Sequence, residues 1–289
     1  MPLSKLSCRV VRKTVPVTYF IYCTPHFASH PTTLLASPTT TNPIQFRLVP
    51  ETLYLCVNLI DRYCQLVDIK RSELQLVGVT ALLIACKYEE IYPPEVRDCV
   101  YITDRAYLRQ QVLDMEQDIL SKLEFRITVP TAYPFLCRYL DLIDAPKLVR
   151  HAASFYMERT LQEHDLLHYR PSLVAASAVI LAMRNPSILR QLQADTEPED
   201  EEDAHPTTDH RAWLSAHNRS GIPQVLLEYT GFSPSEIREV NAIVCTKVAE
   251  EPVTASRRQL VAVKRKWDNA KFRHISTQFD LPLPSHVGL

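Results

Sequence analysis

The sequence predicts an all-α protein made of two tandem helical units that follow a non-helical N-terminal segment. Three observations carry this prediction. After residue 50, apolar residues recur at intervals of three and four, the spacing of one face of an α-helix. Only four glycines occur in the chain, too few for the turns and bulges of an all-β protein. A strongly apolar segment of the first half recurs in the second half, which indicates an internal duplication.

The N-terminal segment, residues 1–50, contains no Asp or Glu and is rich in Thr, Ser and Pro, as in SHPTTLLASPTTTNP. It has no helical period, so we expect it to be disordered. Its apolar patch, VTYFIYC, is too short for the core of a secretory signal. An organellar transit peptide is a less favoured alternative, suggested by the acid-free composition with Arg and Ser.

Three helices are predicted in the first unit, from Glu51 to Leu123. The segment 74–86, LQLVGVTALLIAC, is apolar almost throughout and predicts a helix buried on all sides that ends before Pro93 and Pro94. Amphipathic helices are predicted on either side of it, in 51–64 and 104–123. Their apolar stripes consist of Leu53, Val57, Ile60 and Cys64 in the first helix, and of Leu108, Val112, Met115, Ile119 and Leu123 in the second.

The buried segment is the one that recurs. LVGVTALLIACK (76–87) and LVAASAVILAMR (173–184) share a leucine, a valine and two alanines in register, and Thr80 corresponds to Ser177. Each unit therefore needs a ring of amphipathic helices around one apolar helix. The segment VPTAYPF, residues 129–135, marks the joint between the two units.

Two charged stretches interrupt or follow the second unit. Residues 194–210, ADTEPEDEEDAHPTTDH, are acidic and without apolar period, so we expect a surface loop, with a functional acidic tail as the less favoured interpretation. Residues 256–276 are basic and are interpreted as a solvated helix against the second unit rather than as a phosphate-binding segment.

Composition excludes several classes of function. The net charge of −1 gives no global field that would recruit nucleic acid or a membrane surface. The eight cysteines form no CxxC pair, so we expect reduced thiols in an intracellular protein and no disulfide or zinc framework. No apolar run approaches the roughly 20 residues of a membrane-spanning helix.

No catalytic motif is present: the chain has no Gly-rich phosphate loop, no GxSxG and no HExxH. His164 and His168 are four residues apart and would share a helix face. Without a third ligand at a suitable spacing, a surface or packing role is expected for them rather than metal binding. The sequence therefore predicts a binding module without enzymatic activity, cofactor or metal.

At this point a family resemblance becomes specific. The segments ETLYLCVNLIDRY, LQLVGVTALLIACKYEEIYPPEV, VYITD and VLDMEQDILSKLEF closely resemble the first cyclin box. HDLLHYRPSLVAASAVILA and KRKWDNAKFRHIST are similar to the second box and tail of mitotic cyclins, most of all the B type. The resemblance implies two tandem five-helix cyclin folds. They comprise an N-terminal box at 51–129 and a C-terminal domain at 130–276, followed by a tail at 277–289.

The resemblance also implies a function. Cyclins bind and activate a cyclin-dependent kinase by packing against its mobile C helix, whose glutamate pairs with the ATP-anchoring lysine. A lysine and a glutamate that grip the kinase backbone map onto Lys87 and Glu116. Glu89 and Glu90 are interpreted as helix-terminal surface charge. The apolar kinase-binding positions map onto Leu76, Ile84, Tyr88, Leu120, Phe125 and Ile127.

One departure from the family concerns the residues before Glu51. Cyclins begin this box with a helix that carries a Met-Arg-Ala-Ile-Leu run, whereas this chain has LASPTTTNPIQFRLVP, which cannot form an amphipathic helix. We therefore expect an incomplete first box, from a truncated or wrongly spliced start or, as a second interpretation, in a divergent cyclin. The groove that docks Arg-x-Leu substrate peptides retains only Arg71, Leu74 and Gln75, so docking is in question.

The missing helix has a consequence for Asp61. In the family, the arginine of that helix pairs with the aspartate that corresponds to Asp61. Left buried and unpaired, this carboxylate would cost about 3–5 kcal/mol, the value typical of a broken buried ion pair. Arg62 and Arg47 are the candidates for a substitute partner.

The sequence thus predicts a regulatory subunit that binds and activates a cyclin-dependent kinase in the mitotic cell cycle, in the nucleus and cytoplasm. Three alternatives are a cyclin-fold scaffold associated with transcription, a truncated cyclin with impaired kinase or substrate docking, and, least favoured, an imported enzyme. The scaffold would need a basic face. Lys and Arg are interspersed with acids up to residue 256, so nucleic-acid binding is not expected.

Overall fold

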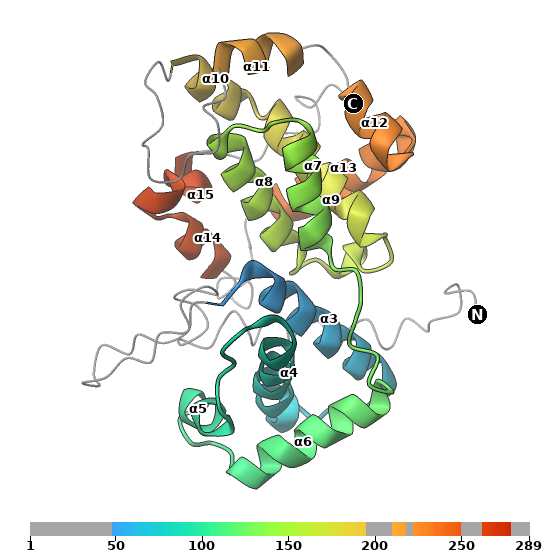
Figure 1. Ribbon diagram of the computed structural model, residues 1–289, viewed down its shortest axis with the longest axis vertical. Coiled ribbons are helices and arrows are strands. Elements are labelled where there is room, and N and C mark those ends of the chain that lie inside the picture. Colours follow the sequence, from blue (N-terminus) through green and yellow to red (C-terminus); the bar gives the residue numbers. More distant parts are fainter. Residues whose placement is uncertain (1–47, 195–209, 218–221, 250–261, 279–289) are drawn as a thin grey trace. The chain divides into compact units, whose positions relative to one another are not determined.

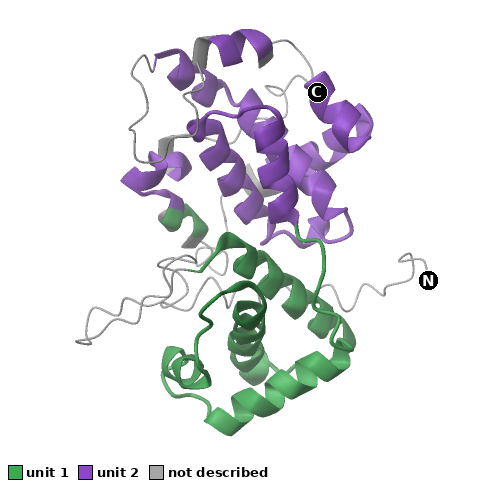
Figure 2. Cartoon of the chain, in the orientation of Figure 1, with its two compact units in different colours: residues 1–131, 254–266 green, residues 132–253, 267–289 purple. Residues whose placement is uncertain are grey.

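All regular elements in the described part of the chain are helices, which confirms the all-α prediction (Figure 1). The computed structural model describes residues 48–194, 210–217, 222–249 and 262–278. The chain divides into two compact units, which are residues 1–131 with 254–266 and residues 132–253 with 267–289 (Figure 2).

Between residues 48 and 131, the described part of unit 1 contains four α-helices and one short 3-10 helix, and residues 262–266 of α14 also belong to this unit. Helix α4 is at the centre and packs against the other three α-helices (Figure 1). The bounds are α3 Pro50–Leu66, η2 Arg71–Glu73, α4 Leu74–Glu89, α5 Val96–Ile102 and α6 Arg109–Lys122. The place of the family's opening helix lies before residue 48, outside the described residues.

Helix α3 is buried more completely than its predicted stripe requires. Leu53, Val57, Ile60 and Cys64 are buried as predicted, and Tyr54, Leu55 and Leu59 on other faces are buried as well. Proline suits the first position of this helix, because the N–H that proline lacks would have no partner within the helix.

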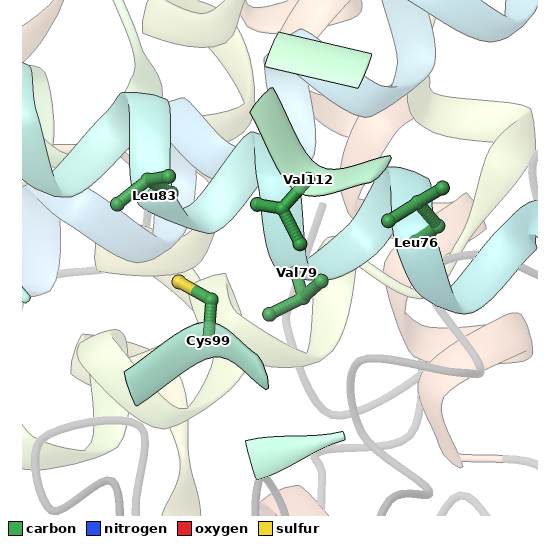
Figure 3. Close-up of a cluster of buried hydrophobic side chains, with 5 residues drawn as sticks. All are labelled: Leu76, Val79, Leu83, Cys99 and Val112. Carbon is green, nitrogen blue, oxygen red and sulfur yellow. The ribbon is translucent and has the colours of Figure 1, made fainter. Parts of the chain in front are cut away.

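Helix α4 is buried on all sides over residues 76–86, as the sequence predicted. It ends at Glu89, before Pro93 and Pro94. Part of its surface forms a cluster with the neighbouring helices (Figure 3). The cluster brings together Leu76, Val79 and Leu83 of α4, Cys99 of α5 and Val112 of α6.

The start of α6 differs from the prediction. The stripe placed the beginning of this helix near residue 104, whereas α6 begins at Arg109. The physical reason is that Asp104 and Arg105 adopt left-handed backbone conformations, with φ of 56° and 57°, which interrupt a right-handed helix. Leu108 consequently lies outside α6 and is 71% exposed, so its assignment to the buried stripe was wrong.

Unit 2 is organised around α9, the counterpart of α4. The residues of α9 at 173–183 are all buried, in register with 76–86 of α4, which confirms the internal repeat. The corresponding hydroxyl side chains, Thr80 and Ser177, are both fully buried. Helices α7, α8 and α13 pack against α9.

The helices of unit 2 range from short 3-10 segments to the 16 residues of α13. The bounds are α7 Ala132–Leu142, α8 Lys147–Thr160, η3 His164–Leu166, α9 Pro171–Arg184, α10 Pro186–Ala194, α11 His210–His217, α12 Gln224–Thr230, α13 Pro234–Ala249, η6 Ala270–Phe272 and α15 Ile275–Gln278. Helix α14, Ala262–Trp267, ends on the first residue of the C-terminal part of this unit.

The basic C-terminal segment is more broken and more buried than predicted. It contains short helices rather than one solvated helix, and Trp267 and Ile275 are buried. The predicted acidic loop lies outside the described residues except for Ala194 and His210, the ends of the flanking helices. Within the described ranges, no single helix has the length and apolarity to cross a membrane.

Candidate functional site

The candidate site is an ion pair between the end of α4 and the middle of α6. The Nζ of Lys87 lies 2.6 Å from Oε1 of Glu116. The Lys87 side chain is 45% exposed and that of Glu116 only 13%, so the cation is presented to solvent above a more buried carboxylate. Lys87 lies in the last turn of α4, where a positive charge is favoured by the helix dipole.

Apolar side chains lie on the surface near this pair. Phe125 is 67% exposed and Tyr88 is 47% exposed. Leu120 and Ile127 are half-buried. These positions combine accessible apolar surface with a charged pair, the composition of a protein–protein contact.

Leu76 and Ile84 lie differently from the rest of the predicted kinase-binding set. Their side chains are only 7% and 3% exposed. They are therefore core residues of α4, and a direct contact with a partner stays a prediction.

The backbone around Phe125 is held in an uncommon conformation by hydrogen bonds. Glu124 and Phe125 both have left-handed conformations, with φ of 53° and 56°. The Phe125 N–H donates to the carbonyl of Leu120 at 2.9 Å, and the Ile127 N–H donates to the carbonyl of Phe125 at 3.0 Å. Such conformations are uncommon for residues other than glycine, so these hydrogen bonds hold a segment that would otherwise relax.

A second polar link joins the end of α4 to the segment after α6. The hydroxyls of Tyr88 and Thr128 form a hydrogen bond of 2.7 Å. Together with the Lys87–Glu116 pair, this link holds the last turn of α4 against the region of α6.

Glu90 was interpreted wrongly from the sequence. Its Oε1 accepts hydrogen bonds from the N–H of Val49, at 2.8 Å, and from the hydroxyl of Thr52, at 2.5 Å. It is thus a structural acceptor at the start of α3 rather than only surface charge. No local signal could have identified this role, because the two partners precede Glu90 by 41 and 38 residues.

Ile91 and Tyr92 are a further feature that the sequence interpretation did not select. They follow α4 directly and are 87% and 88% exposed, the highest exposures among the large apolar residues of the described chain. With Tyr88, they place three exposed large side chains within residues 88–92.

Comparison with known proteins decides the family. The family model described as "Cyclin, N-terminal domain" matches residues 42–128, and the model described as "Cyclin, C-terminal domain" matches residues 130–206. The chain belongs to the cyclin family. The first match begins at residue 42, within the segment that the sequence interpretation had assigned to the N-terminal tail.

Two similar relatives of this cyclin are B-type cyclins. Cyclin-B1-3 of Arabidopsis thaliana is 51% identical over 139 residues, which cover 48% of this chain and 34% of that protein. Cyclin-B1-5 of Oryza sativa subsp. japonica is 35% identical over 272 residues, covering 89% and 53%. The chain thus spans between about a third and a half of the length of these relatives.

A solved structure supports the cyclin fold. A viral cyclin from herpesvirus saimiri matches with a TM-score of 0.51 over 83% of this chain and 88% of that one. Its sequence is only 16% identical, so the likeness concerns the fold alone.

The groove residues of this cyclin lie at the start of α4. Leu74 and Gln75 are half-buried in the first turn of α4, and Arg71 begins the preceding 3-10 helix. The opposite side of the family's groove would come from residues before 48, outside the described ranges. Docking of peptides at these three residues therefore stays a prediction.

Asp61 of this cyclin is buried without a described partner. Its side chain is 8% exposed, and no donor or cation of the described residues bonds to it. Burial raises its pKa from 3.8 to about 7. Arg62 is not the substitute partner, because its Nη2 donates to the carbonyl of Arg126 at 2.7 Å. Arg47 lies outside the described residues.

His164 and His168 were expected to share a face of an α-helix, and the structure does not place them in one α-helix. His164 begins the short 3-10 helix η3, and its Nδ1 lies 2.9 Å from a carboxylate oxygen of Asp165. The ring of His168 lies against that of Tyr169, with centroids 4.0 Å apart. His168 lies in the turn that follows η3, so the two residues do not belong to one α-helix.

Proposed function

We propose that this cyclin is the regulatory subunit of a cyclin-dependent kinase, which it binds and activates in mitosis, and that it has no catalytic activity of its own. The observation that carries the proposal is the Lys87–Glu116 pair, held at 2.6 Å between α4 and α6 beside exposed apolar side chains. The B type of the relatives supports the mitotic assignment.

The chemistry of the pair suits the backbone of a partner helix. The ammonium of Lys87 has three donors and Glu116 uses one of them, so donors remain for the carbonyls of a partner. The carboxylate of Glu116 retains acceptor positions for backbone N–H groups. Charge-assisted hydrogen bonds of this kind are stronger than neutral ones, especially where the apolar side chains Tyr88 and Phe125 exclude water.

Activation of the kinase would follow from the position in which this surface holds the kinase C helix. A kinase C helix packed on this surface would be held where its glutamate reaches the ATP-anchoring lysine. The test is the phosphorylation rate of a purified cyclin-dependent kinase with and without the full chain. We expect a large increase in rate on saturation with the chain. An unchanged rate despite binding would contradict activation.

Docking of Arg-x-Leu peptides is a finer proposal that concerns a different surface. It is supported by the placement of Leu74 and Gln75 in the first turn of α4, next to η2. Fluorescence anisotropy of a labelled Arg-x-Leu peptide tests it, with the peptide in which Ala replaces both Arg and Leu as the control. Equal binding of the two peptides would contradict a groove of this specificity.

A further inference from the structure

The side chain of Glu90 connects the end of α4 to the beginning of α3. Its Oε1 accepts from the N–H of Val49 and from the hydroxyl of Thr52. Its own N–H donates to the carbonyl of Cys86 at 2.9 Å, which closes the last turn of α4. The same residue therefore ends one helix and binds the first turn of another.

Helix α3 has no cap from its own sequence. Its N-cap residue is Val49, whose side chain has no hydrogen-bond acceptor and makes no cap bond. A carboxylate in this position satisfies a free backbone N–H and is favoured by the positive end of the helix dipole. Glu90 thus supplies from a distant segment the bond to the N-cap N–H that Glu or Gln at the third helical position supplies locally in a capping box.

The last turn of α4 is consequently held from two sides. Lys87 ties it to Glu116 on α6, and Glu90 ties it to α3. Both ties are charge-assisted and both depend on where the backbone of residues 87–90 lies. A shift of this turn away from α3 would also change the direction in which the Lys87 ammonium points.

We propose that Glu90 is a positioning residue for the partner-binding pair: by capping α3 it fixes the last turn of α4 and with it the orientation of Lys87. This inference rests on the proposed function, because its effect is read in kinase affinity. Glu90 itself is not required to contact the kinase.

Four variants separate the cap from other effects of position 90. Glu90→Ala removes the acceptor, and Glu90→Gln keeps a carbonyl oxygen in the same place. Thr52→Val removes one donor without changing the size of the side chain, with Thr52→Ser as its matched control. Kinase affinity should fall about three- to tenfold in Glu90→Ala, the change expected if the free energy of the lost cap appears as lost orientation of Lys87. Glu90→Gln keeps the acceptor but not the charge, so its affinity should lie between those of wild type and Glu90→Ala, as should that of Thr52→Val. Thr52→Ser should remain close to wild type.

A double-mutant cycle with Lys87 distinguishes positioning from a general loss of stability. If Glu90 orients Lys87, Lys87→Ala should weaken kinase binding less in the Glu90→Ala background than in the wild type. Equal costs in both backgrounds, measured on folded protein, would overturn the inference. Glu90→Gln provides the comparison if Glu90→Ala does not fold, since failure of Gln to restore affinity would also overturn it.

Hydrogen exchange of the free chain tests the cap without any kinase. The Val49 amide should exchange several-fold faster in Glu90→Ala than in wild type, and Glu90→Gln should restore its protection. Unchanged exchange at Val49 would overturn the inference. A wild-type chain that captures no kinase would instead contradict the proposed function, and that result is obtained before any variant is measured.

Discussion

The indole Nε1 of Trp267 donates a hydrogen bond to Oε2 of Glu158, 3.0 Å away, although the two residues are 109 positions apart in the sequence. The indole also lies against the rings of Phe155 and Phe272, with centroids 6.2 and 4.5 Å away. Only 5% of Trp267 is exposed. The contact fixes the C-terminal residues of unit 2 to helix α8.

Trp267→Ala should therefore destabilise unit 2 strongly. Removing a buried tryptophan costs about 3–5 kcal/mol through lost burial and the cavity that remains. Trp267→Phe keeps an aromatic ring but removes the N–H, so a loss of about 1–3 kcal/mol is expected from the Glu158 carboxylate. Urea unfolding monitored by far-ultraviolet circular dichroism, which reports helix content rather than tryptophan fluorescence, measures both losses. Wild-type stability in Trp267→Ala would show that the C-terminal segment does not support the unit.

The burial of Asp61 predicts a pH dependence of stability. Its pKa rises from 3.8 to about 7 on folding, so between these values the folded state keeps a proton that the unfolded state has released. The contribution of this carboxyl group to the free energy of unfolding is therefore fully present below a pH of about 4. It is lost as the pH rises to about 7. Each unit of pKa difference corresponds to about 1.4 kcal/mol.

Asp61→Asn is the matched variant for this effect, because it preserves shape but cannot ionise. The free energy of unfolding of Asp61→Asn should increase relative to that of the wild type as the pH is raised from about 4 to about 7. Urea titrations at several pH values measure the difference. A difference that does not change with pH would mean that the carboxyl group is not isolated in the folded chain.

The buried thiols of unit 1 should be unreactive in the folded protein. Cys56, Cys86 and Cys99 belong to three helices and are each 0% exposed, and burial raises the pKa of all three. For Cys99 the pKa is raised to about 12. Because the thiolate is the nucleophile, alkylation at neutral pH should require unfolding. Residue-resolved mass spectrometry of iodoacetamide labelling checks this, and rapid labelling of Cys86 without denaturant would contradict it.

Sequence patterns predicted the buried centre of each unit best. Residues 76–86 and 173–183 are apolar on every face, so their burial does not depend on where a helix begins or on which side faces a neighbour. The start of α6 was missed for the opposite reason. Asp104 and Arg105 adopt left-handed conformations that are uncommon for residues other than glycine, so the apolar stripe seemed continuous with the preceding segment.

The site was predictable only in part. Nothing in the local sequence pairs Lys87 with Glu116, and the family resemblance alone selected them. The role of Glu90 escaped even the resemblance, because its partners Val49 and Thr52 come from the start of another helix. Contacts between distant segments depend on how helices pack, which periodicity does not encode.

The affinity of the full chain for a purified cyclin-dependent kinase is the most direct test of the central claim. It is measured for wild type, Lys87→Ala, Glu116→Ala and the double variant, with Lys122→Ala, an exposed lysine in the last turn of α6, as the control. Each single variant should lose about 2–5 kcal/mol of binding free energy, the double variant little more than either, and Lys122→Ala almost none. Wild-type affinity in both single variants would contradict the account.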